Sequence, residues 1–86
     1  MTDTKESQIT VVARAPFHVY YEGPAYSVTA TNSVGTFDIL PGHADFFSML
    51  SECTIIVETA ESKVTFDVHN GMITVRNDEV MLFVNM

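Results

Sequence analysis

The sequence is poor in cysteine and in basic residues. It has a single cysteine, Cys53, so no disulfide can form within the chain and a zinc site built from four thiolates is excluded. A lone thiol is typical of a reducing compartment. Only 4 Lys and Arg residues stand against 11 Asp and Glu residues, which gives a formal net charge of −7. Because a nucleic-acid groove needs clustered basic side chains, we expect no nucleic-acid partner.

Long apolar runs and catalytic signatures are also missing. The uninterrupted apolar runs are only a few residues long, so we expect no segment that inserts into a membrane. The first residues, MTDTKESQ, are polar and lack the apolar core of a secretory signal, and we expect 1–7 to form a flexible N-terminal arm. No nucleophile elbow, phosphate-binding loop, dinucleotide fingerprint or zinc-binding helix motif is present.

What the sequence does have is a two-residue period. Apolar residues make up 47% of the 86-residue chain, which is enough for one small domain with a modest core, and we expect that domain to cover 8–86. Val64, Phe66 and Val68 alternate with polar residues, and several other windows alternate in the same way. Alternation of this kind places one set of side chains on the core face of a strand.

Turn residues divide these windows at short intervals, which predicts an all-β sandwich or barrel. Asn70-Gly71 is the strongest hairpin signal, because both residues tolerate positive φ. The best window for a helical period is Ala44–Leu50, which is long enough for a single turn. The expected strands are 8–14, 17–22, 25–31, 36–39, 47–50, 54–58, 63–69, 72–76 and 80–85.

Some of the outward-facing positions are themselves apolar. Val12, Met81 and Phe83 alternate with residues that we assign to the core. Either both faces of these strands are covered within the domain, or a partner covers one of them.

Three sets of residues are candidates for a chemical or ligand-binding site. His43 has Asp38 and Asp45 nearby, and an Asp–His pair can perform acid–base chemistry, but no nucleophile or substrate clamp accompanies it. We therefore interpret His43 as a group that caps the turn after Pro41-Gly42 or contacts a partner. The pair Asp67 and His69 shares a strand face but lacks a third metal ligand in sequence.

The third set is formed by the tyrosines Tyr20, Tyr21 and Tyr26. A deep pocket lined by these rings would indicate a β-sandwich module that binds a sugar or another small ligand. They would equally suit an interface or an ordinary strand. We expect no cofactor and no metal.

One set of residues resembles a known family. Gly23, Ala25, Val28, Gly35, Phe37 and the block Ile39-Leu40-Pro41-Gly42-His43-Ala44 are similar in order and spacing to the N-terminal β-sandwich of the epsilon subunit of rotary F-type ATP synthases, called delta in mitochondria. Downstream, Asn70–Val75 and Val80–Val84 resemble later strands of the same domain. The similarity covers nearly the whole chain from about Ile9 onward.

The resemblance implies a flattened antiparallel sandwich of about eight to ten short strands and a non-catalytic role in the central rotor. The partners would be the gamma subunit and the polar loops of the membrane c-ring, so that proton-driven rotation is coupled to ATP synthesis. The chain would be peripheral, at the cytoplasmic face of the membrane. Carried over residue by residue, the partner-contact loop would comprise Gly35, Thr36, Pro41, Gly42, His43 and Ala44.

The sequence also departs from the family pattern in three places. Typical members continue into a C-terminal helical hairpin that can inhibit ATP hydrolysis, whereas this sequence ends at Met86, so we expect no such hairpin and do not carry that function over. Thr36 stands where the family often has an acidic residue that contacts the ring. Asp38 and Asp45 replace residues that are commonly glycine and proline, which adds negative charge beside the loop.

Overall fold

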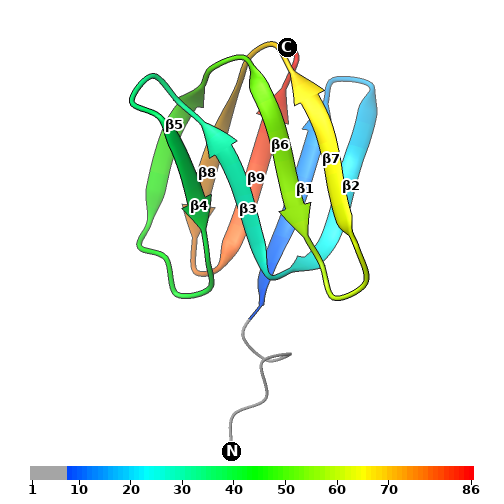
Figure 1. Cartoon of the computed structure of the whole chain (residues 1–86), viewed down its shortest axis with the longest axis vertical. Helices are drawn as coiled ribbons and strands as arrows, with labels where there is room; N and C mark the ends of the chain where they lie inside the picture. The colour runs from blue at the N-terminus through cyan, green and yellow to red at the C-terminus, as the bar shows by residue number, and fades with distance from the viewer. Residues whose placement is uncertain (1–7) are drawn as a thin grey trace, which may run out of the picture.

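Residues 8–86, which the computed structural model describes, form nine strands in two stacked sheets (Figure 1). Each expected window overlaps one strand, so the all-β fold is confirmed, and of the sandwich and the barrel that the turn spacing allowed, the structure is the sandwich. The predicted arm, 1–7, lies outside the described residues. The strands are β1 (Ile9–Ala15), β2 (His18–Ala25), β3 (Ser27–Thr31), β4 (Thr36–Ile39), β5 (Phe46–Leu50), β6 (Cys53–Glu58), β7 (Lys63–Val68), β8 (Gly71–Arg76) and β9 (Glu79–Val84).

The two sheets differ in size and in chain order. One is five-stranded, with the order β2-β1-β9-β8-β5, and the other is four-stranded, with the order β4-β3-β6-β7. Neighbouring strands are antiparallel except for β1 and β9, which are parallel. Strands joined by a tight turn must run antiparallel, whereas β1 and β9 come from opposite ends of the chain and are free of that constraint. The expected antiparallel sandwich therefore contains one parallel pair at its centre.

The core lies between the sheets and is built from one face of every strand. Strands β8 and β9 show the alternation most clearly, since every second residue is buried. Phe66 faces this core, as expected, but is only half-buried because β7 is an edge strand. The fully buried side chains of greatest volume are Ile9, Ile39, Ile55, Ile73, Leu82, Val11, Val28, Val57, Val68, Val75, Val80 and Val84.

Aromatic rings close the two open sides of the sandwich. On the side of β2 and β7, the Tyr20 ring stacks on Phe66 with a centroid distance of 4.6 Å and an interplanar angle of 11°. On the side of β4 and β5, the centroids of Phe37 and Phe46 are 5.4 Å apart. These four rings pack against the buried core at the two edges of the sandwich.

The connections gather at two opposite ends of the sandwich. We call the end at which the chain leaves β9 the upper end, as drawn in Figure 1, and the end at which it enters β1 the lower end. The upper end carries the turns after β1, β3, β5 and β7, and the lower end carries those after β2, β4, β6 and β8. Within residues 8–86 there is no helix with the length and apolarity needed to cross a membrane.

The segment 44–50, the best of the weak helical windows, contains no helical turn, and the strand expected at 47–50 is confirmed as β5. Phe46 and Leu50 pack toward the core while Phe47 and Met49 point outward. The hairpin prediction was wrong. Asn70-Gly71 does not form a hairpin, since β7 and β8 belong to different sheets. Gly71 is required there for space: a Cβ atom would lie 2.7 Å from the carbonyl oxygen of Phe83. The hairpin turn with two consecutive residues at positive φ is Asn77-Asp78, with φ values of 51° and 62°.

The core assignment can be tested on adjacent residues of β9. Leu82 is fully buried, whereas Met81 points to the outer face of the five-stranded sheet. We expect Leu82→Ala to lower the free energy of unfolding by about 2–5 kcal/mol, because it leaves a cavity in the core. Met81→Ala, measured by urea denaturation in parallel, should cost about 1 kcal/mol or less. A larger loss for Met81→Ala than for Leu82→Ala would reverse the assignment of the two faces.

Candidate partner interface

The Pro41-Gly42 segment is a tight turn at the lower end of the sandwich. The backbone N–H of His43 donates to the carbonyl oxygen of Leu40 over 3.1 Å, which closes the turn. Gly42 has a φ of +81°. Proline at the second position followed by glycine with positive φ is the pattern of a type II turn. The direction of the chain after Leu40 is therefore fixed by the two residue types together.

A second contact ties this turn to a distant part of the chain. The backbone N–H of Gly42 donates to the carboxylate of Asp78 over 2.8 Å. Asp78 lies in the turn between β8 and β9, and its carbonyl oxygen accepts a hydrogen bond from Thr10 over 2.8 Å. A hydrogen bond to a carboxylate is stronger than a neutral one. Asp78 thus holds the Pro41-Gly42 turn against the five-stranded sheet, a role that the sequence analysis missed.

His43 is held by local contacts. Its Nδ1 atom lies 2.8 Å from the carbonyl oxygen of Ala44, and because a carbonyl only accepts, Nδ1 carries the proton. Its ring meets Phe46 edge-on at a centroid distance of 5.5 Å. These contacts agree with the interpretation of His43 as a group that bonds backbone atoms near the turn.

The six predicted contact residues do not form one loop. Gly35 and Thr36 lie at the upper end, next to the turn between β3 and β4, whereas Pro41–Ala44 lie at the lower end (Figure 1). Strand β4 separates the two groups. The upper turn is closed by Asn32, whose side-chain oxygen accepts from the N–H groups of Val34 and Gly35 over 2.9 and 3.1 Å. At its tip, the Val34 side chain is 92% exposed.

The outer face of the five-stranded sheet carries an apolar surface. We call it the apolar face and define it by Val12, Phe47, Met49, Met72, Met81 and Phe83. These side chains form two rows across the strands. In one row Met49 pairs with Met72 and Met72 with Phe83. In the row below, Thr74 stands between Phe47 and Met81, and Met81 pairs with Val12.

Two residues of the apolar face are especially open to solvent. Phe47 is 61% exposed and Met49 is 58% exposed. The sequence had indicated Val12, Met81 and Phe83, and the structure adds Phe47, Met49 and Met72. The alternation within FFSML and GMITVR indicated two possible outward sets of side chains in each strand. Only the order of the strands in the sheet shows which set points outward. A contiguous apolar patch of this kind usually marks an interaction site.

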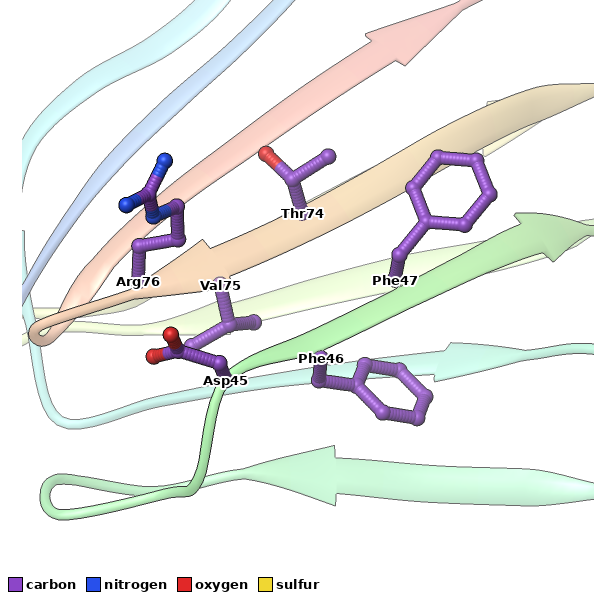
Figure 2. A pocket seen from close by; sticks show the side chains of 6 residues that line it. All are labelled: Asp45, Phe46, Phe47, Thr74, Val75 and Arg76. Carbon is purple, nitrogen blue, oxygen red and sulfur yellow. The ribbon is translucent and has the colours of Figure 1, made fainter.

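A shallow hollow lies at the border between the apolar face and the lower end. It has a volume of about 350 Å³ and is lined by six residues of β5, β8 and the residue before β5 (Figure 2). Phe47 and Thr74 stand on one side, and Asp45 and Arg76 on the other, as Figure 2 shows. Charged groups beside an apolar surface are typical of the rim of a protein interface.

The outer face of the four-stranded sheet has the opposite character. Its threonines bond to neighbouring side chains: Thr29 to Asp38 over 2.5 Å, Thr54 to Asp67 over 2.7 Å and Thr31 to Thr36 over 3.2 Å. These polar groups satisfy one another and remain accessible to water. Ile56 also lies on this face, half-buried between Thr29 and Thr65 of the neighbouring strands. The outer face of the four-stranded sheet is therefore mostly polar, whereas that of the five-stranded sheet carries several apolar side chains.

The structure does not assemble the acid–base set around His43. Asp38 bonds to Thr29 on the outer face of the four-stranded sheet, whereas Asp45 borders the hollow on the five-stranded sheet. The two carboxylates lie on opposite sides of the sandwich, and the hydrogen bond of His43 goes to Ala44. The three groups therefore do not converge on one reacting atom.

The tyrosines do not form a common pocket either. Tyr20 stacks on Phe66, and its hydroxyl accepts from the side-chain amide of Asn85 over 3.0 Å. Tyr21 lines a separate hollow that contains neither of the other tyrosines, and its hydroxyl donates to the carbonyl oxygen of Pro24. Burial, and to a lesser degree the carboxylate of Glu61, raises the pKa of Tyr21 above its usual value of 10.0.

Asp67 and His69 line the same hollow but bond to different partners, and His69 lies just beyond the end of β7. Asp67 accepts a hydrogen bond from Thr54, whereas Nδ1 of His69 lies 3.4 Å from a carboxylate oxygen of Glu52. In the part of the chain that the structure describes, no group of three or more His, Cys, Asp or Glu residues is placed to hold a metal ion.

Comparisons with known proteins converge on one family. The profile of the family described as "ATP synthase, Delta/Epsilon chain, beta-sandwich domain" matches residues 6–86. The ATP synthase epsilon chain of Micrococcus luteus is 32% identical over 63 residues, which cover 72% of this chain and 69% of that one.

Two solved structures share the fold. A chain in the Euglena gracilis mitochondrial ATP synthase, in a structure of OSCP, F1 and the c-ring, superposes with a TM-score of 0.85 at 18% identity, covering 93% of this chain and 52% of that chain. A chain in the Tetrahymena thermophila mitochondrial ATP synthase, in a structure of the central stalk and c-ring, gives a TM-score of 0.75 at 14% identity, covering 87% and 61%. This chain thus spans little more than half the length of these structural relatives.

The conformation of the Pro41-Gly42 turn can be tested at Gly42. No atom lies within 4 Å of the position that a Cβ would occupy, so only the positive φ opposes a side chain there. We expect Gly42→Val to lower the free energy of unfolding by about 1–2 kcal/mol, because a β-branched residue resists this conformation. Gly42→Asn should cost less, since asparagine tolerates positive φ. Equal urea midpoints for wild type and both variants would contradict the strained turn.

Proposed function

Because the chain belongs to the delta/epsilon-chain family of ATP synthases through the β-sandwich domain of that family, we propose that it is a non-catalytic subunit of the central stalk. In this role it links a gamma subunit to the polar loops of a membrane c-ring and rotates with them during ATP synthesis. Two sheets joined by a dry, interdigitated core resist shear, which is the mechanical property that such a link needs.

The observation that carries this proposal is the apolar face. Phe47, Met49 and their neighbours would remain in contact with water unless another protein covered them. An aromatic and methionine-rich centre with Arg14, Arg76 and Glu79 at its border has the composition of a protein interface. We therefore assign the apolar face to the gamma subunit. We assign no partner to the outer face of the four-stranded sheet, which we call the threonine face and whose threonines bond to neighbouring side chains.

The two groups of loop residues then belong to two different contacts. Pro41–Ala44 lie at the lower end near the hollow beside Phe47, so they would meet the edge of the gamma subunit. Gly35 and Thr36 lie at the upper end beside the exposed Val34, so they would meet the ring. Thr36 brings no charge to that contact, and the ring loops would face a neutral hydroxyl where the family often has an acid.

The proposed role requires no chemistry from the chain itself. The candidate acid–base groups lie on opposite sides of the sandwich, and His43 uses its Nδ1 proton in a local hydrogen bond. ATP synthesis would take place on other subunits of the complex. The chain would be peripheral, held at the cytoplasmic face of the membrane through its two partners.

The proposal can be tested by calorimetry with the gamma subunit from the same source. Met81→Lys places a charge at the centre of the apolar face, and Thr65→Lys places the same charge on the threonine face. We expect one-to-one binding that Met81→Lys weakens about a hundredfold or more and Thr65→Lys leaves within about threefold, because a charge buried without a partner is costly. A well-folded wild-type chain that shows no binding would contradict the central-stalk assignment.

A second outcome concerns the choice of face alone. If the gamma subunit binds and Thr65→Lys is the damaging variant, the assignment of the apolar face is wrong while the central-stalk role stands. Circular dichroism of both variants, compared with wild type, shows that any loss of binding does not come from unfolding.

A further inference from the structure

The sandwich has four edge strands, and one of them is unprotected. Strands β2 and β5 border the five-stranded sheet, and β4 and β7 border the four-stranded sheet. An edge strand exposes unpaired backbone groups, and proteins usually protect it with charged residues or proline. Strand β5 has the sequence FFSML, with neither a charge nor a proline. The other three edges carry such residues: Glu22 and Pro24 in β2, Asp38 in β4, and Lys63 and Asp67 in β7.

Strand β5 also continues the apolar face. Phe47 and Met49 point outward from β5 and are more than half exposed, while Phe46 and Leu50 pack toward the core. Covering the edge of β5 would bury parts of these two side chains as well as pair the backbone. The edge and the adjacent apolar surface therefore favour the same event, the addition of another strand in the plane of the sheet.

We propose that in the free chain this strand is supplied by a second copy of the same chain. Strand β5 of one copy pairs antiparallel with β5 of the other, about a twofold axis at Ser48, and joins the two five-stranded sheets into one. With Ser48 on the axis, Phe47 of each copy lies opposite Met49 of the second copy, which gives two aromatic–methionine contacts. The same strand serves both copies, so the interface closes on itself as a dimer.

Charge disfavours self-association at two of the other three edges. The chain has a formal net charge of −7, so two copies repel each other unless the surfaces that meet are neutral. A twofold pairing of β4 would bring Asp38 close to its own copy, and that of β2 would do the same for Glu22. Like charges that face each other across a sheet are destabilising. Strand β7 carries both Lys63 and Asp67, so like-charge repulsion does not exclude it, but only β5 can pair without bringing any charge of its own strand to the axis.

This inference is independent of the proposed function, because it concerns the chain alone. A five-residue edge buries a small area, so we expect a weak dimer that dissociates on dilution. A gamma subunit bound over the apolar face would compete with it, because Phe47 and Met49 belong to both surfaces. The dimer would then be the form in which the chain protects this edge before assembly.

The test is sedimentation equilibrium of the isolated chain, from about 10 µM to about 1 mM, a range in which a weak dimer is populated. Two matched variants distinguish edge pairing from stacking of the apolar faces. Met49→Lys changes the edge strand, and Met81→Lys makes the same change on the same face but on β9, which is separated from β5 by β8. We expect Met49→Lys to weaken the dimer about tenfold or more and Met81→Lys to change it less than about threefold.

Amide hydrogen exchange on the wild-type chain gives a second readout that needs no variant. We expect backbone amides within Phe46–Leu50 to become more protected as concentration rises, while those of β2 do not change. A monomer throughout the concentration range would overturn the proposal. So would a dimer that Met81→Lys disrupts more than Met49→Lys, or one whose concentration-dependent protection lies outside β5.

Discussion

The fold depends on burying one face of each sheet against the other. A chain of 86 residues without a disulfide has no stabilising element of comparable size, so the alternation of buried and outward side chains must hold in nearly every strand. Because Ile, Leu and Val fill the inner positions, the residues at the outer positions determine whether each outer face is polar or apolar. On the four-stranded sheet they are mainly threonines and carboxylates, several of which bond to one another, and on β8 and β9 of the five-stranded sheet they include two methionines and a phenylalanine.

The loops are also held by few interactions. The Pro41-Gly42 turn has few contacts of its own, yet the carboxylate of Asp78 holds it in place from another turn at the same end. At the upper end, Asn32 closes the turn before β4 and also donates to the hydroxyl of Ser48 over 3.1 Å. At the lower end Asp78 thus joins two turns, and at the upper end Asn32 joins a turn to strand β5, so both candidate contact regions are fixed relative to the sheets.

The sequence predicted the strands because period-two alternation is a local property, and each window could be recognised without its neighbours. It failed where the answer depended on which strands lie side by side. Asn70-Gly71 has the composition of a hairpin turn, but the chain crosses there between sheets, and Gly71 is needed because the backbone of Phe83 passes close to it. The hairpin turn with two consecutive positive φ values is instead formed by Asn77 and Asp78, between β8 and β9.

The candidate site was predictable in part for the same reason. Val12, Met81 and Phe83 could be identified as outward and apolar, but their union with residues of β5 and β8 required the order of the sheet. The family resemblance supplied Gly35, Thr36 and Pro41–Ala44 as one loop, whereas the intervening strand β4 sends the two groups to opposite ends. The bond between Gly42 and Asp78 joins residues that are distant in sequence, and no local pattern could have indicated it.

The parallel pairing of β1 with β9 has a mechanical consequence. The first and last described strands are neighbours in the middle of one sheet and run in the same direction, from the lower end to the upper end. A force that pulls the start of β1 and the end of β9 apart would slide the two strands along each other. It would load the hydrogen bonds between them together rather than opening them one after another. The sandwich is therefore built to resist tension along the length of its strands.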